Sequence, residues 1–154
     1  MLSFCGICYA APVSDKAVEP NNTVLRLYKD FAWEVLLDTS ELKVQGLIDQ
    51  PRPVLTRYFD NKLVELLLAD RACAEKNGVC KLDYLPWWGG QDPGASDLQI
   101  LATEDPSIIN VHFKYPGNSQ LIRLKFVMTQ TKAGWRISDI IDGAGNSMLR
   151  TLTQ

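Results

Sequence analysis

Apolar residues in the first half of the chain recur at helical spacing. Between residues 21 and 36 they fall every three or four positions, and Asn21-Asn22-Thr23 stands before them as an N-cap. The spacing predicts an amphipathic helix with a wide apolar face, formed by Val24, Leu25, Tyr28, Phe31, Ala32, Val35 and Leu36.

Two more helical patterns follow. Pro51-Arg52-Pro53 interrupts the first pattern, and a helical turn is predicted from Pro53 to Phe59, because proline suits the first turn of a helix. Asp60 or Asn61 then caps a third helix, which ends near Asn77-Gly78 because this pair is a helix-stop signal.

Beyond Cys80 the apolar residues alternate instead. Strands are predicted at residues 98–102, 108–115, 121–129 and 134–141, and residues 147–152 form a closing helical turn or strand. The alternation assigns an apolar face to the second and third of these strands and places four residues of the fourth on one face: Trp135, Ile137, Asp139 and Ile141.

Helices followed by consecutive antiparallel strands are typical of an α+β fold. We expect one α+β domain over residues 22–154, in which N-terminal helices cover one face of a curved antiparallel sheet of about four strands. Residues 11–21 are expected to be a flexible lead-in.

The first ten residues resemble the remnant of an export signal. Residues 2–9 are apolar and are followed by Ala10-Ala11-Pro12, which allows cleavage near Ala10. The segment is shorter than the about 20 residues that span a bilayer, so stable membrane insertion is not expected. The usual basic flank is missing before Lys16. The pattern predicts a periplasmic or secreted bacterial protein.

Cys73 and Cys80 lie on either side of the predicted helix stop, where the chain folds back over the end of the helix. In an oxidising compartment we expect them to form a disulfide. The alternative is a pair of free thiols in a cytosolic protein. Cys5 and Cys8 match Cys-x-x-Cys, but no strand precedes them as a redox motif requires, so we interpret them as apolar residues of the signal.

Composition and charge narrow the function classes. The 154 residues are 46% apolar and 22% charged, which indicates a folded domain. The net charge is −2 and no run of Lys or Arg exceeds two neighbours, so a nucleic-acid partner is not expected. Phosphate-binding loops, nucleophile elbows and metal-spaced clusters are missing from the sequence, and we predict neither metal nor cofactor.

The most unusual segment runs from Leu82 to Pro93 and holds two adjacent tryptophans, two glycines and two carboxylates. Neighbouring side chains diverge, so one tryptophan is expected to enter the core while the other stays near the surface. One interpretation is a structural plug at the open end of the helices and sheet. The other is a recognition loop, because tryptophan is frequent at binding hot spots, with the contact residues Tyr84, Trp87, Trp88, Gln91 and Asp92.

Asp139 is the best candidate for chemistry, because it alternates with apolar residues and so faces the interior. A buried carboxylate acts either as a catalytic acid or base or as a structural acceptor. No second base is evident, and we favour the structural role. A ligand pocket or an isomerase or hydrolase site would combine Asp139 with a tyrosine such as Tyr28 or Tyr58.

Several short motifs, weak singly, together resemble a family of small exported bacterial proteins of unknown function with a nuclear-transport-factor-2-like, or cystatin-like, fold. They cover roughly residues 22–153 and are Tyr58-Phe59-x-x-x-Leu63, Leu82-Asp83-Tyr84, Gln91-Asp92 and Gly134-Trp135-x-Ile137-x-Asp139-Ile140. The resemblance implies a cone-shaped roll, often with a pocket at its wide end. It implies no single activity, because this fold hosts enzymes, transport adaptors and inhibitors.

The leading hypothesis is a non-enzymatic periplasmic binding protein, an inhibitor or immunity protein against a secreted toxin that attacks the cell envelope as cell-wall hydrolases do. Its contacts would come from the tryptophan loop or from the polar strand face with Arg123 and Lys125. The alternative is a small-ligand protein or a cryptic isomerase or hydrolase that uses Asp139. Homodimerisation is left open.

Overall fold

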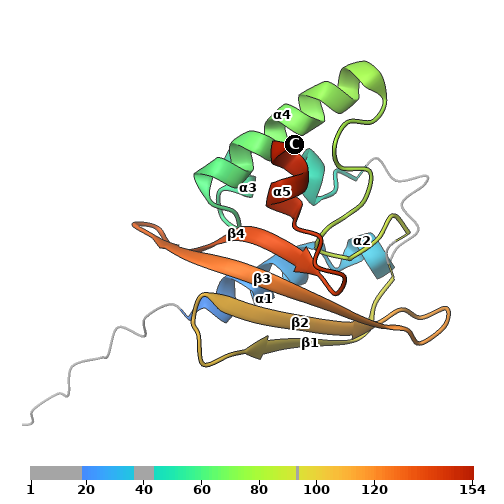
Figure 1. The fold of residues 1–154 in the computed structure, drawn as a ribbon, viewed down its shortest axis with the longest axis vertical. Helices are drawn as coiled ribbons and strands as arrows, with labels where there is room; N and C mark the ends of the chain where they lie inside the picture. Colours follow the sequence, from blue (N-terminus) through green and yellow to red (C-terminus); the bar gives the residue numbers. More distant parts are fainter. Residues whose placement is uncertain (1–18, 37–43, 93) are drawn as a thin grey trace, which may run out of the picture.

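A computed structural model describes residues 19–36, 44–92 and 94–154. Within these ranges the chain forms an α+β fold in which the N-terminal helices pack on an open, four-stranded antiparallel sheet (Figure 1). The predicted signal segment, residues 1–10, and most of the predicted lead-in lie outside the described residues. None of the described helices is long and apolar enough to cross a bilayer.

Helix α1 spans Pro20–Phe31 and a short helix, α2, spans Trp33–Leu36. The prediction that residues 21–23 cap the first helix is wrong, because the helix already begins at Pro20, whose fixed φ suits the first turn. Four apolar side chains of α1 are buried in the core, and Tyr28 meets Phe126 edge to face with ring centroids 6.0 Å apart. Helix α1 therefore lies across one face of the sheet, hereafter the inner face.

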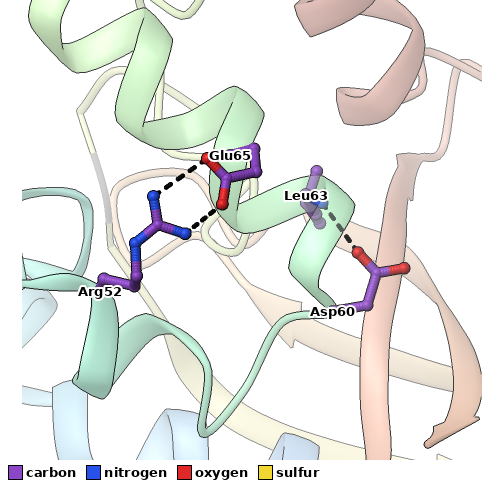
Figure 2. A network of polar contacts seen from close by, with 4 residues as sticks. All are labelled: Arg52, Asp60, Leu63 and Glu65. Atoms are coloured by element: carbon purple, nitrogen blue, oxygen red, sulfur yellow. Dashed lines mark hydrogen bonds and ion pairs between the residues drawn. The ribbon is translucent and has the colours of Figure 1, made fainter.

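Three further helical segments follow along the chain. A 3-10 turn spans Leu47–Asp49, α3 spans Arg52–Leu55 and α4 spans Asn61–Asn77. The predicted cap of α4 is confirmed, since Asp60 accepts a hydrogen bond from the Leu63 amide at 2.8 Å (Figure 2). Figure 2 also shows the exposed ion pair between Arg52 and Glu65 that joins α3 to α4.

Helix α4 ends as the sequence predicts, at a glycine. Gly78 has φ +83°, a left-handed conformation that favours glycine, and its amide donates to the Ala74 carbonyl. The chain then turns back, and Cys73 and Cys80 form the predicted disulfide with their Cα atoms 5.7 Å apart. Asp70 closes the same turn by accepting hydrogen bonds from the amides of Lys81 and Leu82.

The sheet is a simple meander of β1 (Ser96–Ala102), β2 (Ile108–Lys114), β3 (Leu121–Thr131) and β4 (Gly134–Asp142). All four strands were expected from the alternation, with bounds within two residues for each. The inner face carries the buried apolar side chains of β2 and β3, namely Ile109, Val111, Phe113, Leu124, Phe126 and Met128.

One predicted face is wrong. The register pairs Met128 with Ile137 but Val127 with Asp139, so Ser138 is an extra residue in β4, a β-bulge. After the bulge, Ile140 instead of Ile141 stands opposite the core residue Phe126 and is buried. A single extra residue moves the remaining side chains to the other face, because the strand period is two.

The β4 edge of the sheet is covered. Tyr58 and Asp60 exchange backbone hydrogen bonds with Ile137, and Ile141 forms a bridge with Ser147. Helix α5 (Met148–Thr153) follows, capped by the Ser147 side chain, and buries Met148 and Leu152. The closing segment is thus a helix, one of the two predicted forms, and it lies beside β4 and α4 (Figure 1).

Candidate functional site

The tryptophan loop is folded into the core. Leu85 and Gly90 form a bridge, and Gly89 closes the turn between them with φ +68°. A Cβ atom at Gly89 would approach the Ile122 side chain to 3.0 Å, so glycine is required there for space as well as conformation. The turn therefore lies directly against the inner face of β3.

Both tryptophans are buried, with exposed fractions of 0% for Trp87 and 3% for Trp88. The prediction that one of them stays near the surface is wrong. Trp88 packs edge to face on Tyr28 and Phe113, and Trp87 packs on Phe59. The loop is a structural plug between the helices and the sheet, and its indole rings are not available to a partner.

A single carboxylate holds both indoles. Glu34 Oε2 accepts hydrogen bonds from Trp87 Nε1 at 2.8 Å and from Trp88 Nε1 at 2.7 Å. Its Oε1 accepts a third, from the Leu47 amide at 2.7 Å. Glu34 is not among the residues predicted from the sequence, although an acid within the apolar run Trp33–Leu36 is a usable signal, because such an acid needs partners. Glu34 joins α2, the 3-10 turn and the loop.

The two candidate tyrosines also have structural partners. The Tyr28 hydroxyl donates to the Trp87 carbonyl at 2.7 Å, and burial raises the pKa of Tyr28 well above its usual range. The Tyr58 hydroxyl donates to Asp30 at 2.6 Å. Burial, and then the hydrogen bond to Asp30, raise the pKa of Tyr58 to about 12. Both hydroxyls therefore stay protonated at neutral pH and serve as donors.

Asp139 is engaged by its own neighbourhood. Its Oδ1 accepts from the amides of Ile140 and Leu149, each at 2.8 Å, and its Oδ2 accepts from the Ser147 hydroxyl at 2.6 Å. The carboxylate thus anchors the start of α5 on β4. A carboxylate that already accepts three hydrogen bonds is poorly placed to take a proton from a substrate. Asp139 shares no hydrogen bond with Tyr28 or Tyr58, whose hydroxyls donate to the Trp87 carbonyl and to Asp30. The geometry supports the structural role of Asp139.

The remaining loop candidates stand apart. Gln91 and Asp92 are exposed, and Gln91 donates to Asp83 at 3.1 Å. Tyr84 is half-buried; burial raises its pKa, a hydrogen bond with Thr151 opposes this rise, and the carboxylates of Asp142, Asp83 and Asp139 add to it. Because Trp88 and Gly89 pack on the inner face, the structure does not join the tryptophans with Arg123 and Lys125 into one surface.

Arg123 and Lys125 lie on the opposite side of the sheet, which we call the outer face. By register it also carries the two cross-strand partners of these residues, since His112 stands opposite Arg123 and Asn110 opposite Lys125. By the same register this face also carries Gln99, Leu101, Ile108, Lys114, Leu121, Val127 and Ile141. All of these are exposed or half-buried, whereas the inner positions of β2 are buried.

A cavity of about 370 Å³ opens on the outer face. It lies between β2, β3 and the turn after β4, and is lined by His112, Arg123, Lys125, Ile141, Asp142 and Gly143 among others. We call it the basic cavity. A neighbouring hollow of about 460 Å³ is lined by residues of β1, β2 and β3 and shares His112 with it. The outer face is therefore hollowed and cationic at its centre.

The cations beside the two hollows differ in whether they form ion pairs within the protein. Lys114, beside the second hollow, forms an ion pair with Asp97 at 2.9 Å. Within the described residues, Arg123 and Lys125 have neither an ion pair nor a side-chain hydrogen bond. The acid lining the basic cavity, Asp142, accepts instead from Ala144 and Asn146 in its own turn. Two cations thus remain free to bind an external acceptor.

The described residues contain no group of three or more His, Cys, Asp or Glu side chains that could hold a metal ion. Comparisons of the chain with protein-family models, curated proteins and solved structures found no match. The resemblance drawn from the short motifs therefore stays a prediction.

Proposed function

We propose that this chain is a non-enzymatic, exported binding protein that inhibits a protein partner, an envelope-attacking hydrolase of the secreted-toxin type, through the outer face of its sheet. The observation that carries the proposal is the contrast in bonding between candidate residues. Asp139, Trp87 and Trp88 are held by internal hydrogen bonds. Arg123 and Lys125 are exposed and unpaired within the described residues.

Export is supported by the disulfide. Cys73 and Cys80 are paired, and disulfides persist in oxidising compartments such as the bacterial periplasm. The apolar segment ending at Ala10 is the second support, as the signal that would direct the chain there. We place the working protein in the periplasm on these two grounds.

The fold proposal is a nuclear-transport-factor-2-like, or cystatin-like, roll. It is supported by the order of elements, with helices first and a four-stranded meander after them, and by helix α1 lying across the inner face. In this proposal the tryptophan loop fills the open end between helices and sheet. An inhibitor needs a filled, rigid body with a free recognition face, and this arrangement suits that need.

The proposal is tested by protection in living cells. The chain is expressed with its own signal in bacterial hosts that each export one cell-wall hydrolase from a panel of secreted toxins. We expect at least one of these hosts to survive, and its hydrolase to co-elute with the purified chain on gel filtration. A catalytically inactive hydrolase serves as the matched control for toxicity. Unaltered killing together with separate elution would rule out the proposed inhibitory function.

A further inference from the structure

The basic cavity is built by cross-strand neighbours. His112 and Arg123 are directly opposite each other, as are Asn110 and Lys125, so the four side chains leave the sheet on one face. Opposed residues on antiparallel strands have Cβ atoms about 4.5–5.5 Å apart. Arg123 and Lys125 are two residues apart on β3, so their side chains also leave the same face of the sheet. An anion placed between them could be bound by both.

The cavity offers an anion more than charge. Arg123 provides a planar, forked donor that matches a carboxylate, and Lys125 provides a second, flexible donor. Asn110 and His112 line the same cavity and add donors at its floor. On the turn side, Gly143 carries no side chain, which leaves room for the main chain of a ligand.

The surroundings select the class of ligand. Leu121 and Leu101 on the same face are exposed to 42% and 39%, and Ile141 lines the cavity itself. Apolar residues around the two cations, Arg123 and Lys125, suit a polypeptide in which acidic side chains alternate with apolar ones. A nucleic acid would require a longer basic stripe, whereas the chain as a whole is acidic, with net charge −2.

We infer that the basic cavity binds the carboxylate of an Asp or Glu side chain on an acidic, partly apolar segment of the protein partner, with Arg123 and Lys125 as its ligands. The inference rests on the proposed function, because it names the chemistry by which the outer face recognises its target. The contact is electrostatic and desolvated at its centre, with Leu101, Leu121 and Ile141 forming its apolar rim.

The test uses the full chain, labelled with ¹⁵N, and a hexapeptide in which leucine and glutamate alternate. We expect chemical-shift changes in the amides of Asn110, His112, Arg123 and Gly143 that saturate with peptide concentration and weaken with added salt. A peptide with glutamine in place of glutamate is expected to produce no saturating change. Equal responses to the two peptides, or changes centred on another part of the protein, would overturn the inference.

A double variant, Arg123→Gln with Lys125→Gln, tests the ligands. Its affinity for the glutamate peptide is expected to fall about tenfold or more, because two charge-assisted hydrogen bonds are lost. Lys62→Gln with Lys76→Gln on α4 removes the same charge from exposed positions elsewhere and is expected to change affinity less than about twofold. A similar loss in both double variants would show a general charge effect and overturn the inference.

A third variant, Gly143→Val, tests the cavity without changing charge. A Cβ atom at Gly143 meets the Arg123 carbonyl at an ordinary 3.6 Å, so the fold should tolerate the side chain while the cavity loses volume. Peptide affinity is expected to fall, with an unchanged spectrum for the inner-face residues. Unchanged affinity would contradict binding in this cavity, as would tighter binding of a single-stranded RNA or an anionic phospholipid vesicle than of the glutamate peptide.

Failure of this inference is distinguishable from failure of the proposed function. If the Arg123→Gln, Lys125→Gln variant still protects the host and the peptide does not bind, the outer face does not recognise a carboxylate but inhibition stands. If the peptide binds with charge specificity and the wild-type chain gives no protection, the carboxylate site stands and the inhibitory function is wrong.

Discussion

The tryptophan loop and the outer face of the sheet are the two surfaces that the sequence offers for recognition, and they differ in what their polar groups do. In the loop, both indole nitrogens donate to Glu34 and the Trp87 carbonyl accepts from Tyr28. On the outer face, Arg123 and Lys125 point away from the core from an ordinary strand and have no such partners among the described residues.

The difference teaches which signal to follow. Unusual composition drew attention to residues 82–93, yet rare aromatic residues are also what a small domain uses to fill a large gap between helices and sheet. Unsatisfied donors are more informative. A donor with an internal partner stabilises the fold, whereas an exposed cation without one can bind an external acceptor without first breaking an internal contact.

The largest expected effect comes from the loop. Trp87→Ala should lower the free energy of unfolding by about 4 kcal/mol, because it removes a fully buried indole from contact with Phe59 and leaves a cavity. Urea unfolding followed by circular dichroism measures it. Partner protection should be unaffected at temperatures where the variant is folded; loss of protection with unchanged stability would return the loop to the list of recognition elements.

Glu34→Ala is expected to cost about 3 kcal/mol, since it leaves two indole donors and the Leu47 amide without an acceptor. Glu34→Gln keeps one carbonyl oxygen and should cost less. Tryptophan fluorescence should report the change in both variants, because the carboxylate touches both indoles. A stability of the alanine variant equal to wild type would mean that Glu34 does not hold the loop.

Removing the disulfide is next. Cys73→Ser with Cys80→Ser should cost about 2.5 kcal/mol, the loop-closure entropy of so short a loop in the denatured chain. The matched control is reduction: dithiothreitol should destabilise the wild-type protein by a similar amount and leave the double variant unchanged. Asp70 still binds the two amides beyond Cys80, so the folded turn should survive. A loss of stability of the double variant on adding dithiothreitol would contradict the assignment of the effect to the Cys73–Cys80 disulfide.

A smaller effect is expected at the start of α4. Asp60→Ala removes the acceptor of the Leu63 amide, seen in Figure 2, and should cost about 1 kcal/mol. Asp60→Asn preserves an acceptor and should retain most of the stability. This cap is a reference for the other variants, because its cost reports the loss of one N-cap hydrogen bond, whereas Glu34→Ala loses three. A cost as large as that of Glu34→Ala would show that Asp60 has further partners.

Local signals were predictable from the sequence. The strands β2 and β3 were located by strict alternation, and the ends of α4 by Asp60 and Gly78, because each of these depends on neighbouring residues only. The first turn of α1 was misplaced because Asn21-Asn22-Thr23 looked like a cap, while Pro20 already occupied the helix start.

Long-range pairings were not predictable. Ser138 shifts the register of β4, and an extra residue is visible only against its partner strand, at Val127. Glu34 meets indoles more than fifty residues away, a distance that no periodic pattern reports. The outer face was anticipated at Arg123 and Lys125, since alternation alone separates the two faces, but the basic cavity depends on the turn at Gly143, which only the fold brings beside β3.

The smallest expected effect on stability completes the comparison. Arg123→Gln with Lys125→Gln should change the free energy of unfolding by less than about 0.5 kcal/mol, because both side chains are exposed and unpaired among the described residues. No loss of stability is expected, because neither side chain has an internal partner among the described residues. Protection of the host, by contrast, should be lost. Stability and recognition would then be carried by separate parts of the molecule, the loop and the outer face. A double variant that is strongly destabilised would break this separation, because it would show that the two cations have internal partners and are not held ready for an external carboxylate.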